Sequence, residues 1–318
     1  MTGTTRAAGL ALGYLADVLL GDPRRGHPVA AFGTLATGLH KRLHRDSRIA
    51  GVAYVTALVG GVTILGVVVD RATRPHPLAH TVTTAVATWA VLGGTSLARE
   101  GDTMTQLLDD AARDGDLIPA RARLSHLCSR DATDLDAAEL ARAAVESLAE
   151  NTSDAVTAPL LWGALAGVLG LLGYRAANTL DAMVGYRTPE LERFGWAAAR
   201  FDDLLNLAPA RLTALITVSA APLVGGRSSD AWRAWRRDAP AHPSPNAGPV
   251  EASAAGALGV RLGGSNSYAG AVEDRGTLGD GPAPGVADLP RAVRLTRVVG
   301  LGALGVSVLA ALAIGARR

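Results

Sequence analysis

The sequence contains few of the residues that several common protein classes require. It has a single cysteine, Cys128, so no disulfide can form within the chain and nothing calls for an oxidising compartment. Lys41 is its one lysine, which excludes a Walker-type phosphate loop because that motif needs Gly-Lys followed by Ser or Thr. Aromatic residues make up 4% and the net charge is only +2, without a basic-aromatic stripe. This composition argues against a nucleic-acid partner.

Charged residues are also scarce relative to apolar ones. Hydrophobic residues make up 48% of the chain, charged residues 19%, and the mean hydropathy is +0.21. Ordinary soluble proteins are less apolar than this, so the composition favours a membrane protein. Several segments approach the roughly 20 residues that a membrane span needs. They are 7–20, 50–69, 75–98, 155–174, 212–226 and 298–316.

These segments predict an all-α, polytopic integral membrane protein with four to six hydrophobic helices. We expect one membrane-embedded domain over residues 1–318, with a helical polar loop at 99–154 and a Pro/Gly-rich polar loop at 227–297. Basic residues concentrate in 21–49, 99–154 and 227–297, which favours a cytoplasmic location for these loops and for the active site. The first apolar run lacks a small-residue cleavage site and is expected to be a retained helix. Segment 155–174 has Pro159 near its start and is expected to be broken or re-entrant.

The polar loops have different characters. In 99–154, a break at Asp114–Asp116 separates helical patterns, and Thr133 or Asp134 is expected to cap the last helix. Loop 227–297 opens with a basic amphipathic stretch at 232–237 that suits a membrane surface. Its later part, 276–282, is rich in turn residues, and no strand alternation is evident there.

Three acids precede the segment 155–174 at a helical spacing. Glu146, Glu150 and Asp154 are four residues apart, so on one helix they would stack on one face, with Arg142 one turn earlier. Such a face is either an exposed helix surface or a site for Mg²⁺ or acid–base chemistry beside a phosphorylated nucleotide. Three neighbouring carboxylates repel one another unless a cation balances them, which favours the second interpretation.

More polar residues follow that apolar segment. Asn178 and Asp181 are flanked by Arg175 and Arg187, and a second group contains Arg200, Asp202 and Asp203. Either these residues form a solvated helix surface, with Arg200 and Asp203 as an ordinary pair three residues apart, or they line a polar cavity.

Proline-containing turns supply the remaining candidates. Asp22 and His27 lie in Asp-Pro-Arg-Arg-Gly-His-Pro, which is either a simple turn or a receiver for phosphate or carboxylate. His242, Ser244 and Asn246 lie in a stretch with three prolines, whose rigidity would hold polar side chains outward. The glycine-rich stretch 256–268, which includes Asn266, could cradle phosphates through backbone N–H groups.

Together these motifs resemble one family. The segments are His242-Pro-Ser-Pro-Asn-Ala-Gly, Glu146-Ser-Leu-Ala-Glu-Asn-Thr-Ser-Asp154, Asn178-Thr-Leu-Asp-Ala-Met-Val-Gly-Tyr-Arg187, Phe194-Gly-Trp-Ala-Ala-Ala-Arg200 and Gly21-Asp-Pro with His27-Pro. In this order, over about residues 17–280, they are similar to the integral-membrane adenosylcobinamide-phosphate synthases of cobalamin biosynthesis. The sequence departs from the family at 248–251, where a tryptophan-containing variant is expected, so no role is carried over to Glu251.

The resemblance implies an ATP-dependent ligase in the cell membrane. It would join aminopropanol or its O-phosphate to a propionate of adenosylcobyric acid, giving adenosylcobinamide or its phosphate. Neither the sequence nor the resemblance explains the membrane location, and our hypothesis is that the lipid bilayer scaffolds other cobalamin-assembly enzymes.

The resemblance also implies roles for the motif residues. Glu146, Glu150 and Asp154 would hold Mg²⁺ and ATP, with Asp181 or Asp202 as the base. The substrate-binding set would be Asp22, His27, Asn151, Arg175, Asn178, Arg187, Arg200, His242, Ser244, Asn246 and Asn266.

Two other functional classes remain open at this point. A membrane transporter of a small polar or corrinoid substrate would also place polar groups and broken helices in the bilayer. A membrane sensor without catalytic activity could be built on the same fold. No inverted repeat is evident, and the acidic and asparagine motifs are all present, so the ligase is the preferred hypothesis.

Overall fold

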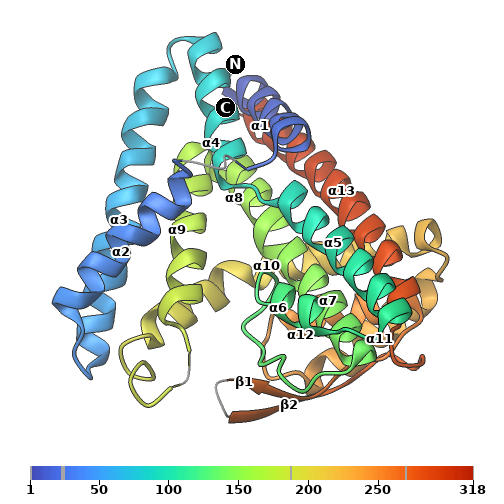
Figure 1. Cartoon of the computed structure of the whole chain (residues 1–318). Helices are drawn as coiled ribbons and strands as arrows, with labels where there is room; N and C mark the ends of the chain where they lie inside the picture. Colours follow the sequence, from blue (N-terminus) through green and yellow to red (C-terminus); the bar gives the residue numbers. More distant parts are fainter. Residues whose placement is uncertain (1, 23–25, 187, 269–270, 318) are drawn as a thin grey trace. The chain divides into compact units, whose positions relative to one another are not determined.

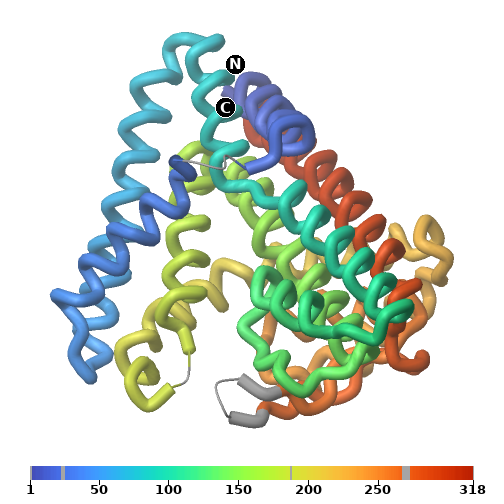
Figure 2. Tube along the Cα trace, viewed as in Figure 1, coloured from blue at the N-terminus to red at the C-terminus, as the bar shows by residue number. Residues whose placement is uncertain are grey.

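The computed structural model describes residues 2–22, 26–186, 188–268 and 271–317 (Figures 1 and 2). The chain forms two compact units, each built from segments that are distant in sequence. Unit 1 is Met1–Gly93, Asp154–Asn206 and Ala303–Arg318, and unit 2 is Gly94–Ser153 and Leu207–Gly302. Because compactness alone does not show that a unit folds by itself, the single domain over 1–318 stays a prediction.

The regular structure among the described residues of unit 1 is all helical. Its elements are α1 (Thr2–Leu20), α2 (Pro28–Leu43), α3 (Arg48–Thr73), α4 (Pro77–Val91), the π-helical turn η1 (Ser153–Thr157, from its second residue), α8 (Ala158–Ala166), α9 (Val168–Val184), the start of α10 (Trp196–Ala220) and the end of α13 (Leu289–Ala316). One apolar cluster of this unit surrounds Tyr54 and Phe194, which are both fully buried.

Small residues let α1 pack closely on its neighbours in unit 1. A Cβ at Gly13 would lie 2.4 Å from Cβ of Thr88 on α4, so no side chain fits there. At Gly3 a Cβ would lie 2.6 Å from Cα of Gly315 on α13. Figure 2 shows α1 beside α4, with the two ends of the chain close together.

The apolar segment 155–174 is interrupted, as the sequence analysis predicted. It is divided between η1, α8 and α9. Gly167 separates α8 from α9 with φ 72° and ψ −146°, a conformation that favours glycine. A Cβ at Gly167 would also lie 2.8 Å from Oδ1 of Asp70. The backbone conformation and the lack of space therefore both select glycine at the break.

Unit 2 combines helices with one small sheet. Its elements are α5 (Gly94–Asp114), α6 (Ile118–Leu124), α7 (Ala137–Thr152), the end of α10, η2 (Ala221–Val224), α11 (Ser228–Asp238), η3 (Ala239–Ala241), α12 (Ala247–Leu258), β1 (Leu262–Tyr268), β2 (Ala271–Leu278), η4 (Val286–Asp288) and the start of α13. Every residue of α12 is buried, and α7 is buried on most sides. These two helices carry much of the alanine-rich core of the unit.

The polar loop 99–154 is helical as predicted, with its break after Asp114, but the predicted helix cap is wrong. The cap of α7 is Asp136, whose side chain accepts a hydrogen bond from the backbone N–H of Glu139 at 2.8 Å. Glu139 accepts the N–H of Asp136 at 3.0 Å and completes a capping box. Thr133 instead donates its hydroxyl to Asp131. Because the box satisfies two amide groups at once, it fixes the start of α7.

The expectation that the end of loop 227–297 lacks strands is also wrong. Strands β1 and β2 form an antiparallel hairpin that pairs Leu262 with Leu278 and Asn266 with Glu273. An irregularity between Gly263 and Ser265 shifts the register. Gly276, one of the glycines that suggested a turn, lies on the partner strand at this irregularity and has φ 68°.

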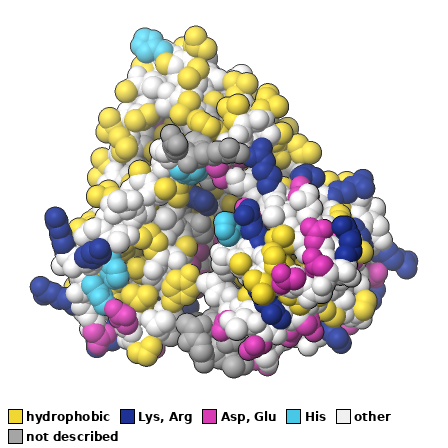
Figure 3. Space-filling model, viewed as in Figure 1, with side chains coloured by type: hydrophobic (Ala, Val, Ile, Leu, Met, Phe, Trp, Pro, Cys, Tyr) yellow, Lys and Arg dark blue, Asp and Glu magenta, His cyan; other side chains and the backbone are white. Residues whose placement is uncertain are grey.

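Among the described residues, three helical stretches are long and apolar enough to cross a bilayer: Arg48–Thr73, Trp196–Val224 and Val286–Ala316. They contain the predicted segments 50–69 and 298–316 and all but the last two residues of 212–226, so the fold is that of a helical membrane protein. In contrast, α4 has 15 residues, about 22 Å, so segment 75–98 does not form one span-length helix. Hydrophobic side chains dominate the surface over α3 and α4 in Figure 3. The number of spans stays a prediction.

Candidate functional site

The centre of the polar cluster in unit 2 is Glu146 on α7. Its side chain is buried, and Oε2 accepts a hydrogen bond from Nη2 of Arg130 at 2.5 Å. Oε1 accepts the backbone N–H of Gly263 at 2.7 Å. Arg142, one turn earlier on α7, lies 3.9 Å from Oε1, as its spacing predicted. A buried carboxylate is tolerated here because an arginine and an amide occupy both of its oxygens.

The cluster depends on local backbone conformations. A Cβ at Gly263 would lie 2.2 Å from the carbonyl oxygen of Gly276, so the bulge of the hairpin needs glycine at this position. Arg142 donates a hydrogen bond to the carbonyl oxygen of the same Gly263. Therefore α7 binds both the N–H group and the carbonyl oxygen of Gly263. These contacts hold the bulge on α7 and fix the position of Glu146.

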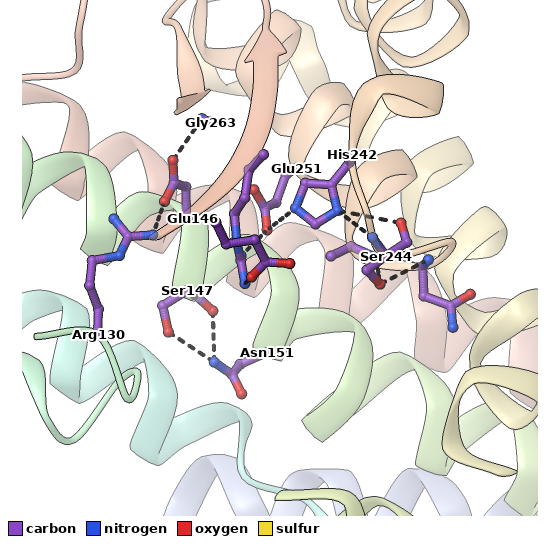
Figure 4. A network of polar contacts seen from close by, with 12 residues as sticks. Arg130, Glu146, Ser147, Asn151, His242, Ser244, Glu251 and Gly263 are labelled. Carbon is purple, nitrogen blue, oxygen red and sulfur yellow. Dashed lines mark hydrogen bonds and ion pairs between the residues drawn. The ribbon is translucent and has the colours of Figure 1, made fainter. Parts of the chain in front are cut away.

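A second buried carboxyl group, Glu251 on α12, continues the cluster (Figure 4). Its Oε1 lies 3.5 Å from Nη1 of Arg275 on β2 and 3.7 Å from Nε2 of His242. Neither oxygen has a hydrogen-bond partner among the described residues. Burial, with added repulsion from Glu146 and Glu150, raises the pKa of Glu251 well above its usual value. Burial and nearby Arg275 lower the pKa of His242 to about 4, which favours a neutral imidazole.

Glu150 lies one turn after Glu146, at the end of α7, and is partly buried. Burial raises the pKa of its carboxyl group, as does the charge of Glu146, while Arg275 and Arg130 oppose the change. Its neighbour Asn151 has a structural role. The Asn151 amide donates to the hydroxyl and the carbonyl oxygen of Ser147, each at 2.9 Å (Figure 4). Glu150 is more available than Glu146, because Glu150 is partly exposed whereas Glu146 is buried.

The polar residues of the proline-rich turn 242–249 mostly support that turn. The ring of His242 accepts the N–H of Ser244 at 3.0 Å, and the hydroxyl of Ser244 accepts the N–H of Ala247 at 3.1 Å. Asn246 accepts a hydrogen bond from Arg211 at 3.1 Å. In contrast, Asn266 on β1 is 3% exposed, and its amide atoms have no hydrogen-bond partner among the described residues. Among the substrate-binding candidates of unit 2, Asn266 is therefore the best placed to bind another molecule.

Unit 1 contains a separate polar network. Asn206 donates to Asp202 at 2.9 Å and accepts the hydroxyl of Tyr174 at 2.9 Å. Asn178 donates to the other oxygen of Asp202 at 3.4 Å and receives a long hydrogen bond, 3.4 Å, from Arg175. The network links α9 and α10 and satisfies the buried Asp202 with amide donors. Asn178 and Asp202 therefore belong to a polar network between two helices and not to a solvated helix surface, which was one alternative.

A cavity of ≈ 200 Å³ in unit 1 adjoins Arg175. Its walls are apolar side chains of α2, α3, α4 and α9, and the polar lining residues are Arg175 and Thr179. Pro28 and Val29, which follow His27 directly, line the same cavity from α2. The early Asp-Pro-to-His-Pro motif and the Asn178 motif therefore reach the same cavity.

The other predicted residues have simpler surroundings. His27 caps α2 by accepting the N–H of Val29 at 3.2 Å, and it lies 3.9 Å from Asp22. Arg200 is largely exposed and lies 3.6 Å from Asp203, the ordinary helix pair that was the alternative. Asp181 is on α9 in unit 1. Arg187 lies outside the described residues.

The proposed Mg²⁺ ligands do not form a ready-made metal site. Within the described ranges, no group of three His, Cys, Asp or Glu side chains is arranged to hold an ion. The α-helix ends at Thr152, so Asp154 lies in the π-helical turn that follows it, and it is assigned to unit 1. Glu146 is already occupied by Arg130 and Gly263. A magnesium ion that arrives on ATP needs only one or two protein carboxylates, so it does not require a preformed site of three acids.

The comparison with known proteins identifies the family. The model of the CobD/CbiB protein family matches residues 10–296. The chain belongs to the CobD/CbiB family. A relative from Mycobacterium tuberculosis, named cobalamin biosynthesis protein CobD, is 54% identical over 318 residues, covering 100% of this chain and 98% of the relative. A relative of the same name from Chromobacterium violaceum is 42% identical, covering 96% and 97%. No solved structure matches significantly.

Membership of the CobD/CbiB family gives the chain a role in cobalamin biosynthesis, and that role implies a corrinoid substrate. From the sequence of this family member, no role was assigned to Arg130, Arg275 or Glu251 in the unit 2 cluster. Arg130 follows α6 in an irregular segment, and Arg275 comes from an unforeseen strand. The one available signal for Glu251 was its position in an alanine-rich, apolar stretch. An acid that is buried among such residues needs a specific partner.

Proposed function

We propose that this protein catalyses an ATP-dependent amide ligation on its corrinoid substrate. The carboxylic acid is a propionate side chain of adenosylcobyric acid, and the amine is aminopropanol or its O-phosphate. The product is adenosylcobinamide or its phosphate. Membership of the CobD/CbiB family supports the pathway and the corrinoid, while the reaction itself is argued from the chemistry of the unit 2 cluster.

The observation that carries the proposal is the balance of charges in unit 2. Three arginines and three glutamates converge there from α7, α12, β2 and the segment before α7. They are Arg130, Arg142, Arg275, Glu146, Glu150 and Glu251. Arginine is suited to bind carboxylates and phosphates because its planar fork donates two parallel hydrogen bonds. Such a cluster supports binding of an anionic nucleotide beside an anionic acid.

The reaction needs this kind of environment in both of its steps. A carboxylate is a poor electrophile, so one of its oxygens first attacks the γ-phosphorus of ATP, forming an acyl phosphate and releasing ADP. The amine nitrogen then attacks the acyl carbon, phosphate leaves, and a base takes the proton from the nitrogen. Arginines aimed at the phosphoryl and acyl oxygens would stabilise the negative charge that develops on them. Magnesium arrives with ATP as part of the substrate.

Within unit 2, Glu150 is our candidate for the base. It is partly exposed, and its raised pKa makes it a stronger base than an ordinary carboxylate. Asp181 and Asp202, in unit 1, remain alternative bases. His27, Arg175 and Arg187 remain proposed phosphate contacts.

The test uses the purified full-length chain in detergent with ATP, Mg²⁺, adenosylcobyric acid and aminopropanol phosphate. Mass spectrometry should detect the coupled corrinoid in the presence of ATP and not without it. Glu150→Gln should lower kcat by about 100-fold or more, because the loss of a base typically costs that much. Glu146→Gln is less informative, since it also breaks a buried ion pair.

Glu139→Gln on the same helix is the matched control. It makes the same chemical change, and glutamine can replace glutamate in a capping box, so activity should remain at the wild-type level. A Glu150→Gln variant with the wild-type kcat would remove the proposed base. Absence of product from the wild type, with the corrinoid shown to bind, would contradict the ligase proposal.

One observation favours a transporter as the second candidate. The break at Gly167 leaves two helix ends, of α8 and α9, within an apolar segment, as in many transporters. A transporter would accumulate a corrinoid inside vesicles without forming a new covalent product. A vesicle assay that follows both labelled corrinoid uptake and its mass distinguishes the two candidates.

A further inference from the structure

Helix α11 of unit 2 presents tryptophan and arginine side chains to the exterior. Its inner face, which includes Ala231 and Ala234, is buried, and the helix packs along α12. Trp232 is 46% exposed, and the ring of Trp235 lies 5.2 Å from it in an edge-on arrangement. The guanidinium group of Arg236 lies 6.0 Å from the centre of the Trp232 ring. Nothing in the proposed ligase reaction uses these residues.

Several arginines of this region have no acidic partner in the described part of the chain. Arg233 and Arg237 are neutralised by Asp230 and by Asp238 with Asp280. Three further arginines are exposed, and their side chains form neither an ion pair nor a hydrogen bond with the described residues. These three, which we call the arginine patch, are Arg227 before α11, Arg236 on α11 and Arg294 on α13.

The patch lies where two candidate membrane helices meet within unit 2. The stretch Trp196–Val224 ends at Val224, whose carbonyl oxygen accepts a hydrogen bond from Nε of Arg291 at 3.0 Å. Arg291 precedes the uncharged run 298–316 of α13 by about two helical turns. One apolar stretch therefore ends beside the place where the other begins, and α11 starts just after Val224.

This arrangement marks the position along both helices at which apolar residues give way to charged residues. Leu223, at the end of the first stretch, is 52% exposed, and Trp232 follows on α11. Tryptophan is enriched at the boundary between lipid and water because its ring is apolar with one polar N–H group. Exposed arginines beside a membrane helix attract anionic lipid headgroups.

We infer that α11 lies in the headgroup layer of the bilayer and that the arginine patch binds the phosphate groups of anionic phospholipids. The ring of Trp232 would then sit at the lipid–water boundary. Lipid fits better than a soluble acidic partner for two reasons. Exposed apolar residues accompany the positive charges, and Arg227 and Arg294 each lie three residues beyond Val224 and Arg291, where the two candidate membrane helices meet.

The first test measures lipid binding to the intact protein by native mass spectrometry in detergent. We titrate phosphatidylglycerol and, separately, phosphatidylcholine. The wild type should bind the anionic lipid more tightly, and the triple variant Arg227→Gln/Arg236→Gln/Arg294→Gln should bind it about 10-fold or more weakly. Equal affinity for the two lipids, or no change in the triple variant, would overturn the inference.

The matched control is the triple variant Arg42→Gln/Arg99→Gln/Arg113→Gln, which removes the same charge at three other exposed positions. It should lose less than half as much affinity as the patch variant. Equal losses in the two variants would show a general effect of net charge and would contradict a specific patch.

The second test locates Trp232. In nanodiscs, brominated phosphatidylglycerol quenches tryptophans that lie in the membrane, and Trp232→Phe should reduce the quenched fraction of the fluorescence. Unchanged quenching in Trp232→Phe would place Trp232 outside the bilayer and overturn the inference. Neither test measures amide formation, so a failed ligase assay and a failed lipid assay remain distinguishable.

Discussion

At the scale of single residues, Glu146 and Glu251 show two ways to bury a carboxyl group in one cluster. Glu146 has close hydrogen bonds to Arg130 and Gly263, so its negative charge is balanced where it lies. Glu251 has only Arg275 and His242 nearby, at 3.5 and 3.7 Å, and no hydrogen bond to its oxygens within the described residues. Its raised pKa indicates that folding favours the protonated form.

The raised pKa of Glu251 predicts how stability depends on pH. Above its ordinary pKa the unfolded chain loses this proton while the folded chain keeps it, so the wild type loses stability as pH rises through that window. Glu251→Gln removes the cost because glutamine cannot ionise. The gain in melting temperature of Glu251→Gln over the wild type should therefore be larger at about pH 8 than at about pH 5.

Thermal unfolding in detergent at the two pH values measures this difference, with Glu139→Gln as the control. Glu139 lies at the start of α7 and accepts a backbone amide. Its variant should differ from the wild type by a similar amount at both pH values. If the gain of Glu251→Gln shrinks as pH rises, Glu251 is ionised in the folded protein and the assignment is wrong.

At the scale of elements, α7 depends on its first turn for its position. The capping box of Asp136 and Glu139 starts the helix that carries Arg142, Glu146 and Glu150. Asp136→Ala should lower the free energy of unfolding by about 1 kcal/mol, since it leaves amide groups of the first turn without partners. Thermal or denaturant unfolding of the protein in detergent measures the loss.

Thr133→Ala provides the control for this cap. Thr133 is exposed and bonds only with Asp131, so its replacement should change stability by less than about 0.5 kcal/mol. If Thr133→Ala lowers the free energy of unfolding more than Asp136→Ala does, Thr133 caps the helix, as the sequence first suggested.

The elements also show what the sequence could predict. Spacing along one helix is a local property, so the approach of Arg142 to Glu146 and the pairing of Arg200 with Asp203 followed from it. The hairpin was missed because its register is set by a glycine bulge that resembles a turn. Arg275 was missed with it, because pairing between strands decides where its side chain lies. Regular helical spacing also did not predict the π-helical turn after Thr152, which contains Asp154.

At the scale of the whole molecule, hydropathy predicted the class but not the lengths of the helices. Apolar runs 50–69 and 298–316 became span-length helices because nothing interrupts them. In 155–174 Gly167 ends one helix and begins another, whereas 75–98 contains the junction of α4 and α5 near Gly93. Such breaks depend on contacts with residues distant in sequence, such as Asp70 beside Gly167, which hydropathy does not record.

The three long apolar helices predict firm association with the bilayer. After washing with alkaline carbonate, the chain should remain in the membrane pellet, because each apolar stretch would have to leave lipid for water. A peripheral protein in the same membranes serves as the control and should be released. Release of this chain into the supernatant would contradict a spanning arrangement.

The composition of unit 1 has a consequence for how the protein is made. Its helix α1 packs at Gly3 against Gly315 of α13, so the two helices that meet are synthesised far apart in time. A ribosome adding 5–20 residues per second needs roughly 15–60 s to make the intervening chain. During that interval the glycine of α1 that receives α13 has only lipid or other helices as neighbours. The order of synthesis therefore requires the nascent protein to persist in the membrane in an incomplete form before its last helix arrives.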